Sequence, residues 1–312
     1  MGKAGYVAGR LVQIIPTLVA IGILVFVLSR LLPGGPVAAM LGDRASDETV
    51  ARLTAQYGLD QPVIVQFWRF LANIARGDFG ASLAYHMPVL SLIAERLPVT
   101  LALTGLAALI ALALAVPLAF AAALHQNRWP DFLIRGLFQV GLSSPVFYVG
   151  LILLTVFAAN LRIFPVGGYG DTAGQHLIHL FLPALTLAMS FSAIIMRSLR
   201  ASIIDVLGAE YVSFARAKGL SRRTILARHV LRNALVATVS LIGLNIGELL
   251  GGAVITESVF AVPGVGRLMV DSIFARDYPV VQALTMVLAV FVSLAFLATD
   301  MVQMALDPRV AK

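Results

Sequence analysis

The chain of 312 residues contains no cysteine. It can therefore form neither disulfides nor thiolate metal sites, and thiol redox chemistry is excluded. It also lacks the Gly-x-x-x-x-Gly-Lys-Ser/Thr loop that cradles nucleotide phosphates and the His-Glu-x-x-His pattern of zinc hydrolases. If ATP powers this protein, we expect the nucleotide to bind a partner.

Charged residues are scarce as well, at 12% of the chain against 59% hydrophobic residues, and the mean hydropathy is +0.91. This composition indicates an integral membrane protein. Five charge-free windows reach the roughly 20 residues that cross a bilayer; they are 11–29, 97–127, 136–161, 172–196 and 278–299. We add a sixth span at 235–257, despite Glu248 and Glu257, because without it the flanking loops would lie on sides that contradict their charge. The prediction is an all-α protein with six transmembrane helices.

The distribution of Lys and Arg predicts the orientation of these spans. With the N-terminus inside, the cytoplasmic segments hold Lys3, Arg10, Arg128, Arg135, eight basic residues from Arg197 to Arg232, Arg309 and Lys312. The short outer loops hold only Arg162, Arg267 and Arg276. Basic residues concentrate on the cytoplasmic side, so both termini are predicted inside. The net charge of +7 is therefore a topology signal, and it does not indicate nucleic-acid binding.

The chain divides into an N-terminal span with an external helical segment, a five-helix core and a short cytoplasmic tail, at residues 1–97, 98–306 and 307–312. The apolar core of the first span is longer than that of a signal peptide, so we expect an uncleaved anchor. Two helices are predicted on the outer surface, one over 47–57 that ends at Gly58 and one over 63–74 that ends near Gly77.

A basic helix-turn-helix is predicted within the loop 200–234, between two apolar runs. Its first helix covers 209–219 and its second continues to His229. Gly219 suits the left-handed position that closes a helix, and Ser221 can cap the next helix through its side-chain oxygen. An ordered, basic surface element on a membrane protein suggests that another protein docks there.

Motifs dispersed over most of the chain resemble one family. They are Leu-Leu-Pro-Gly-Gly-Pro at 31–36, Tyr-Gly-Leu-Asp-Gln-Pro at 57–62, Arg-Gly-Asp-Phe-Gly at 76–80, Glu-Arg-Leu-Pro-Val-Thr at 95–100, Arg-Ala-Lys-Gly-Leu at 216–220, Gly-Gly-Ala-Val-Ile-Thr-Glu at 251–257, Pro-Gly-Val-Gly-Arg at 263–267, Arg-Asp-Tyr-Pro at 276–279 and Leu-Asp-Pro-Arg at 306–309. In this order they resemble ABC importer permeases of the dipeptide, oligopeptide and nickel type, first permease subunit. The chain departs from the family at Gly35, where Asp is frequent, and at Ser213 and Phe214 within the family's Glu-Ala-Ala signature, of which only Ala215 matches.

The resemblance implies a type I ABC importer permease fold in the bacterial inner membrane, forming half of a translocation pathway. It implies a homologous second permease, two ATPase subunits that bind ATP and Mg, and an extracytoplasmic binding protein. It implies no catalytic residue, cofactor or metal in this chain and no nucleic-acid partner. The residues expected to couple to the ATPases are Glu210, Phe214, Ala215, Ala217, Lys218, Gly219 and Arg222.

The fifth span carries two further predictions. Gly243, Gly247 and Gly251 recur every four residues, which predicts a stripe where another helix approaches closely. The polar face, roughly 130° around the helix, is formed by Asn245, Glu248 and Gly252. An acid within a span is costly and suggests a polar cavity or an ion partner. Glu248 could line the translocation pathway, pair with another helix or subunit, or lie near the outer interface, whereas Glu257 and Asp300, near span ends, favour structural roles.

Two other classes of protein stay open. A secondary transporter would need inverted repeats and intramembrane coupling carboxylates, of which only Glu248 is credible. A membrane enzyme would need a catalytic constellation, but Asp171 of the Gly-x-Gly-Asp pattern lies in a predicted outer loop, and His176 and His179 have no acidic third ligand beside them. For an importer, peptides are the favoured substrate, with nickel chelates, glutathione or oligosaccharides as alternatives.

Overall fold

The computed structural model describes residues 3–28, 48, 52, 54–55, 60–82 and 84–306, and this part of the chain is mostly helical. The elements are α1 Lys3–Leu28, α4 Val63–Ala75, α5 Val89–Leu124, α6 Trp129–Ser143, α7 Val146–Leu153, η2 Leu154–Asn160, α8 Ala173–Leu207, α9 Glu210–Ala217, α10 Arg222–Thr224, η3 Ile225–Leu231, α11 Arg232–Leu244, α12 Ile246–Val259, α13 Val265–Phe274 and α14 Tyr278–Leu306. η2 and η3 are π-helical segments that continue α7 and lead into α11. The predicted all-α class is confirmed.

Five helices in the described part are long and apolar enough to cross a membrane, and a bent pair raises the count to six. The bent pair consists of α6 and of α7 continued by η2, and the chain bends by 104° between them. The span predicted over 136–161 is therefore a broken one, and not a single continuous helix. The chain turns at Ser144, which is extended (ψ 130°) because the following Pro145 disfavours the helical conformation of the residue before it.

The predicted helix over 235–257 is also interrupted. α11 ends at Leu244, Asn245 leaves the helical conformation (φ −95°, ψ 2°), and α12 begins at Ile246. The helix that qualifies as a span runs from Arg222 to Leu244. Its first turns therefore include basic residues that precede the predicted span at 235–257.

The predicted glycine stripe meets another helix of this chain at one of its three positions. A Cβ at Gly243 would collide with Thr299 of α14, so the two helices do approach closely at this position. Nothing lies within 4 Å of the corresponding point at Gly247 or Gly251. The stripe therefore supports close packing at Gly243 alone.

The most extensive packing in the described part joins α5 and α8. Every fourth residue of α5 from Ala107 to Ala119 is an alanine that is fully buried. Small side chains at this spacing form one narrow face, which lets a neighbouring helix approach closely. The sequence predicted close packing at glycines of the fifth span, and no prediction concerned these alanines. A second, smaller core joins the start of α5 to α13 and α14.

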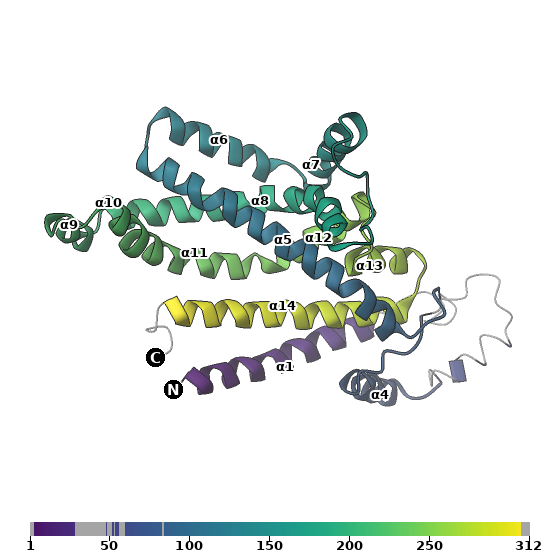
Figure 1. Ribbon diagram of the computed structural model, residues 1–312. Coiled ribbons are helices and arrows are strands. Elements are labelled where there is room, and N and C mark those ends of the chain that lie inside the picture. Colours follow the sequence, from purple (N-terminus) through teal and green to yellow (C-terminus); the bar gives the residue numbers. More distant parts are fainter. Residues whose placement is uncertain are drawn as a thin grey trace.

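The two ends of the bundle carry different elements (Figure 1). The start of α1, the end of α14, the α5–α6 connection and α9 with α10 gather at one end, and α4, α7 and α13 gather at the other. α4 matches the predicted helix over 63–74 and is followed by Gly77 in a left-handed conformation (φ +72°). The predicted boundary at residue 97 falls inside α5, which begins at Val89.

Three sequence predictions concern residues outside the described part of the chain. These are the Leu-Leu-Pro-Gly-Gly-Pro motif at 31–36, most of the helix predicted over 47–57, and the tail 307–312 with its Leu-Asp-Pro-Arg motif. They stay predictions.

Candidate functional site

The turn after α9 has the predicted helix-turn-helix geometry. Gly219 is left-handed (φ +76°), and its N–H donates to the carbonyl of Arg216 at 2.9 Å. The N–H of Leu220 donates to the carbonyl of Ala215 at 3.3 Å. These two bonds form a Schellman motif, which ends the helix and satisfies its last carbonyls. Ser221 then caps α10 by accepting a hydrogen bond from the Thr224 N–H at 3.3 Å.

One face of α9 is packed against the rest of the chain. Val212 and Ala215 are buried in the core formed by the end of α8 and by η3, where Ile225 and Val230 are buried too. Asn233 of α11 donates a hydrogen bond to the hydroxyl of Tyr211 at 3.0 Å. Because buried contacts join α9 to both neighbouring spans, displacement of α9 should move α8 and α11 with it.

The other face of α9 and the turn beyond it project from the bundle (Figure 1). Phe214 exposes 67% of its surface, although it is a large aromatic residue, and Tyr211 and Leu220 are exposed beside it. Aromatic residues and cations on a projecting surface are typical of protein–protein interfaces. Of the predicted coupling residues, those exposed on this surface are Glu210, Phe214, Ala217, Lys218, Gly219 and Arg222. Ala215 instead faces this chain's own core, so a partner would not contact it.

Of the three residues predicted to share a polar face, Asn245 lies at the break before α12, and Glu248 and Gly252 lie four residues apart within α12. Asn245 lies at the break and donates to the carbonyl of Leu241 at 2.7 Å. Glu248 is exposed in the first turn of α12, where a carboxylate interacts favourably with the helix dipole. A Cβ at Gly252 would lie 3.0 Å from Leu187, so this glycine faces α8. In the part of the chain that the structure describes, Glu248 makes no ion pair.

A buried carboxylate holds the α12–α13 hairpin on α5. Glu257 is fully buried, accepts a hydrogen bond from the hydroxyl of Thr100 at 2.5 Å and accepts another from the Arg267 N–H at 2.9 Å. Thr100 in turn accepts a hydrogen bond from the Val265 N–H at 2.9 Å. A Cβ at Gly264 would collide with the Glu257 carboxylate, so only glycine allows this approach. The motifs at 95–100, 251–257 and 263–267 thus meet at one site, and Glu257 has the structural role predicted for it.

Two more carboxylates join segments that are distant in sequence. Asp277, which is 1% exposed, accepts hydrogen bonds from the Ser82 hydroxyl at 2.5 Å and the Ala84 N–H at 3.1 Å. These two hydrogen bonds connect the segment before α5 to the start of α14. Asp300 of α14 pairs with Arg10 of α1 at 2.9 Å, which agrees with its predicted structural role.

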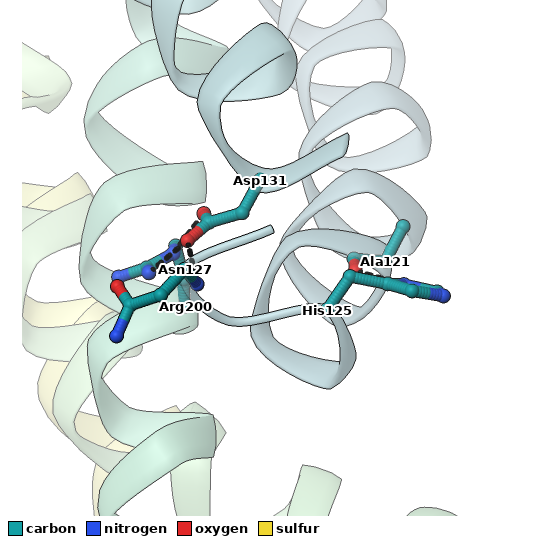
Figure 2. Close-up of polar contacts among 5 residues, drawn as sticks. All are labelled: Ala121, His125, Asn127, Asp131 and Arg200. Atoms are coloured by element: carbon teal, nitrogen blue, oxygen red, sulfur yellow. Dashed lines mark hydrogen bonds and ion pairs between the residues drawn. The ribbon is translucent and has the colours of Figure 1, made fainter. Parts of the chain in front are cut away.

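The sequence analysis did not single out Asp131, although it forms the most enclosed ion pair in the described part (Figure 2). Its side chain is fully buried, and its two oxygens accept from Nε and Nη2 of Arg200 at 2.7 and 2.6 Å. Asn127 has a left-handed conformation (φ +60°), and its backbone N–H also donates to Asp131 at 2.9 Å. The pair joins α6 to α8, and Figure 2 shows it next to the α5–α6 connection, where His125 contacts the carbonyl of Ala121.

The two histidines considered for zinc are held in separate contacts at the start of α8. His176 stacks on Tyr169 with 3.9 Å between ring centres, and His179 contacts the carbonyl of Gly167 at 2.9 Å. Within the described residues, no three metal-ligating side chains come together. These contacts hold the loop that precedes α8 against the helix.

Two family models match the chain. Residues 115–312 match the binding-protein-dependent transport system inner membrane component, and residues 4–104 match the N-terminal part of the membrane components of the same systems. The glutathione transport system permease protein GsiC of Salmonella paratyphi A is 40% identical over 98% of both chains, and GsiC of Escherichia coli K12 is 39% identical over the same shares.

A solved structure has the same fold. A chain of the MetNI methionine ABC transporter, in an inward-facing conformation, superposes with a TM-score of 0.57 at 16% identity. The match covers 70% of this chain and 98% of the other. At this identity the likeness concerns the fold alone.

Proposed function

Because this chain belongs to the family of binding-protein-dependent transport system inner membrane components, a multi-pass permease subunit of an ABC importer, we propose that it imports glutathione and similar short peptides. The proposed substrate is supported by the 40% identity to a glutathione permease along almost the whole of both chains. The sequence analysis favoured peptides in general and gave glutathione as an alternative, and the similarity to glutathione permeases now favours that alternative. Nickel chelates and oligosaccharides are the competing substrates.

ATP hydrolysis is assigned to two partner ATPases, which would bind ATP and Mg, and α9 is their docking element. The exposed Phe214 supports this role, because it gives a partner an apolar anchor among cationic side chains. Closure of the ATPases would push α9, and its buried contacts with α8 and η3 would carry the movement into the spans. The basic residues around α9 favour a cytoplasmic position for this end of the bundle.

A homologous second permease would complete the pathway, and an extracytoplasmic binding protein would deliver the substrate at the end that carries α4 and α13. Glu248 is the residue we assign to the pathway between the two permeases. It is exposed on this chain and has no cation beside it in the described part, so a hydrated path or a partner subunit would supply its surroundings.

The test is reconstitution of the chain with its second permease, its ATPases and its binding protein in liposomes. Glutathione-loaded binding protein should stimulate ATP hydrolysis and drive uptake of labelled glutathione, whereas ligand-free binding protein should do neither. If only a nickel chelate or an oligosaccharide stimulated ATP hydrolysis, that compound would replace glutathione as the proposed substrate. Purification of the chain as a lone, proton-driven carrier would overturn the assignment of ATP-driven transport.

A further inference from the structure

A cleft of about 530 Å³ opens between α6 and α8. Its lining residues come from the middle turns of α6, residues 132–139, and from the half of α8 nearest α9, so it lies towards the end of the bundle that carries α9. Three arginines, Arg135, Arg197 and Arg200, line it together with Gln139. Its volume falls within the roughly 300–1,000 Å³ of small-molecule sites.

Two of the three arginines make no direct contact with a carboxylate in the described part, although the charge of Arg135 also acts on Asp131. Asp131 neutralises Arg200 through the paired hydrogen bonds described above. Within the described residues, neither Arg135 nor Arg197 forms an ion pair. Their charges would repel each other in an empty cleft, so an anion bound between them would be favoured.

Contacts with α6 hold both unpaired guanidinium groups at the cleft. Arg197 donates to Oε1 of Gln139 at 3.1 Å. The Arg135 guanidinium lies over the ring of Phe132, 5.6 Å from the ring centre, which is within the limit of about 6 Å for a cation–π contact. Each guanidinium has five N–H donors, and these contacts use few of them. The remaining donors can bind the oxygens of a phosphate group, which arginine forks match well.

The surface next to the cleft is apolar. Leu133, Leu137 and Val140 of α6 are exposed, and the exposed Trp129 lies at the start of the helix. Tryptophan is enriched at the membrane interface, and Arg135 lies six residues further along the helix, about 9 Å at a rise of 1.5 Å per residue. An arginine at this depth can reach the headgroup region, while the aliphatic side chains face acyl chains.

We propose that the cleft between α6 and α8 binds the phosphate group of an anionic phospholipid from the cytoplasmic leaflet. Arg135 and Arg197 supply the charge and the donors, and the exposed aliphatic face of α6 contacts the acyl chains. Basic pockets between transmembrane helices on the cytoplasmic side bind such headgroups. The apolar surface beside the arginines favours a lipid over free phosphate, because free phosphate would gain nothing from it.

The experiment measures retention of phosphatidylglycerol by the assembled transporter in nanodiscs of phosphatidylcholine with a small fraction of phosphatidylglycerol, read by native mass spectrometry. The cleft variant is Arg135→Gln/Arg197→Gln. The matched control is Arg128→Gln/Arg228→Gln, which removes the same charge from exposed positions outside the cleft. Arg200 is left intact, because its loss would strand the buried Asp131.

The wild type and the control should retain phosphatidylglycerol, and the cleft variant should lose about tenfold or more in affinity. Arg135→Lys/Arg197→Lys should recover part of it, because the charge remains without the planar fork. Equal retention by the cleft variant and the control would overturn the proposal. Displacement of the lipid by millimolar inorganic phosphate would assign the cleft to a free anion, and displacement by glutathione would assign it to the transport pathway; either result would overturn the lipid assignment.

Discussion

The ion pair between Asp131 and Arg200 allows a stability prediction that follows from its geometry. Removing one partner of a buried pair typically costs about 3 to 5 kcal/mol, because the other charge is left without compensation. The two partners are not equivalent, since the Asp131 side chain is 0% exposed and that of Arg200 is 15% exposed. Water can partly solvate a stranded Arg200 but not a stranded Asp131.

We therefore expect Asp131→Asn to cost about 3 kcal/mol and Arg200→Met to cost more, towards about 5 kcal/mol. The double variant should recover much of this loss, because no buried charge remains. Asparagine at 131 also keeps an oxygen that can accept from the Asn127 N–H. The wild type, the two single variants and the double variant form a double-mutant cycle. We expect it to give a coupling energy of about 2 kcal/mol or more between the two sites.

The assay is thermal unfolding of the four proteins in the same detergent. At about 2 °C per kcal/mol for a chain of this size, the single variants should unfold about 6 °C and about 10 °C below the wild type. The double variant should lie closer to the wild type than Arg200→Met does. Additive losses in the double variant, or equal and small losses in both singles, would refute the reasoning that burial makes each partner depend on the other.

Two further predictions concern transport, and a third concerns the orientation of the chain in the membrane. Gly219→Val should abolish stimulation of ATP hydrolysis by loaded binding protein while the complex still assembles. The reason is that the left-handed backbone of Gly219 costs roughly 1–2 kcal/mol for a residue with a Cβ. Gly219→Asn is the control, because asparagine tolerates that conformation. Normal stimulation in Gly219→Val would remove the turn after α9 from the coupling mechanism. Glu248→Gln should change glutathione uptake at unchanged complex yield, and either loss of the complex or unchanged uptake would remove Glu248 from the pathway. In this cysteine-free chain, Asp60→Cys should react with an impermeant maleimide in intact spheroplasts and Ser221→Cys should not; the reverse pattern would invert the proposed orientation.

Local chemistry was sufficient to predict the helix-turn-helix around Gly219. Gly219 and Ser221 have the φ angle and the capping bond that their residue types favour, because a helix end depends on a few consecutive residues. The helix α4 was predicted for the same reason. The broken helices were not predicted, because hydropathy measures only how apolar a window is, and the stretches around Ser144 and Asn245 are apolar on both sides of the break.

Pairs that are distant in sequence were beyond the reach of the sequence analysis. The motifs at 95–100, 251–257 and 263–267 were recognised as marks of a family, but nothing in them indicates that Thr100 and Glu257 form a hydrogen bond. No sequence prediction concerned Asp131, and Arg200 was counted only among the basic residues of a predicted cytoplasmic segment. Only the packing of α6 on α8 encloses them together.

Composition, the spacing of charges and the order of the motifs were thus enough to determine the membrane class, the helical architecture and the permease family, because each is a property of the chain summed along its length. Which glycine packs closely, which carboxylate is buried and where two unpaired arginines meet were decided by the tertiary structure. These features depend on the distance between helices far apart in sequence, and that distance is set by small buried side chains such as the alanines of α5.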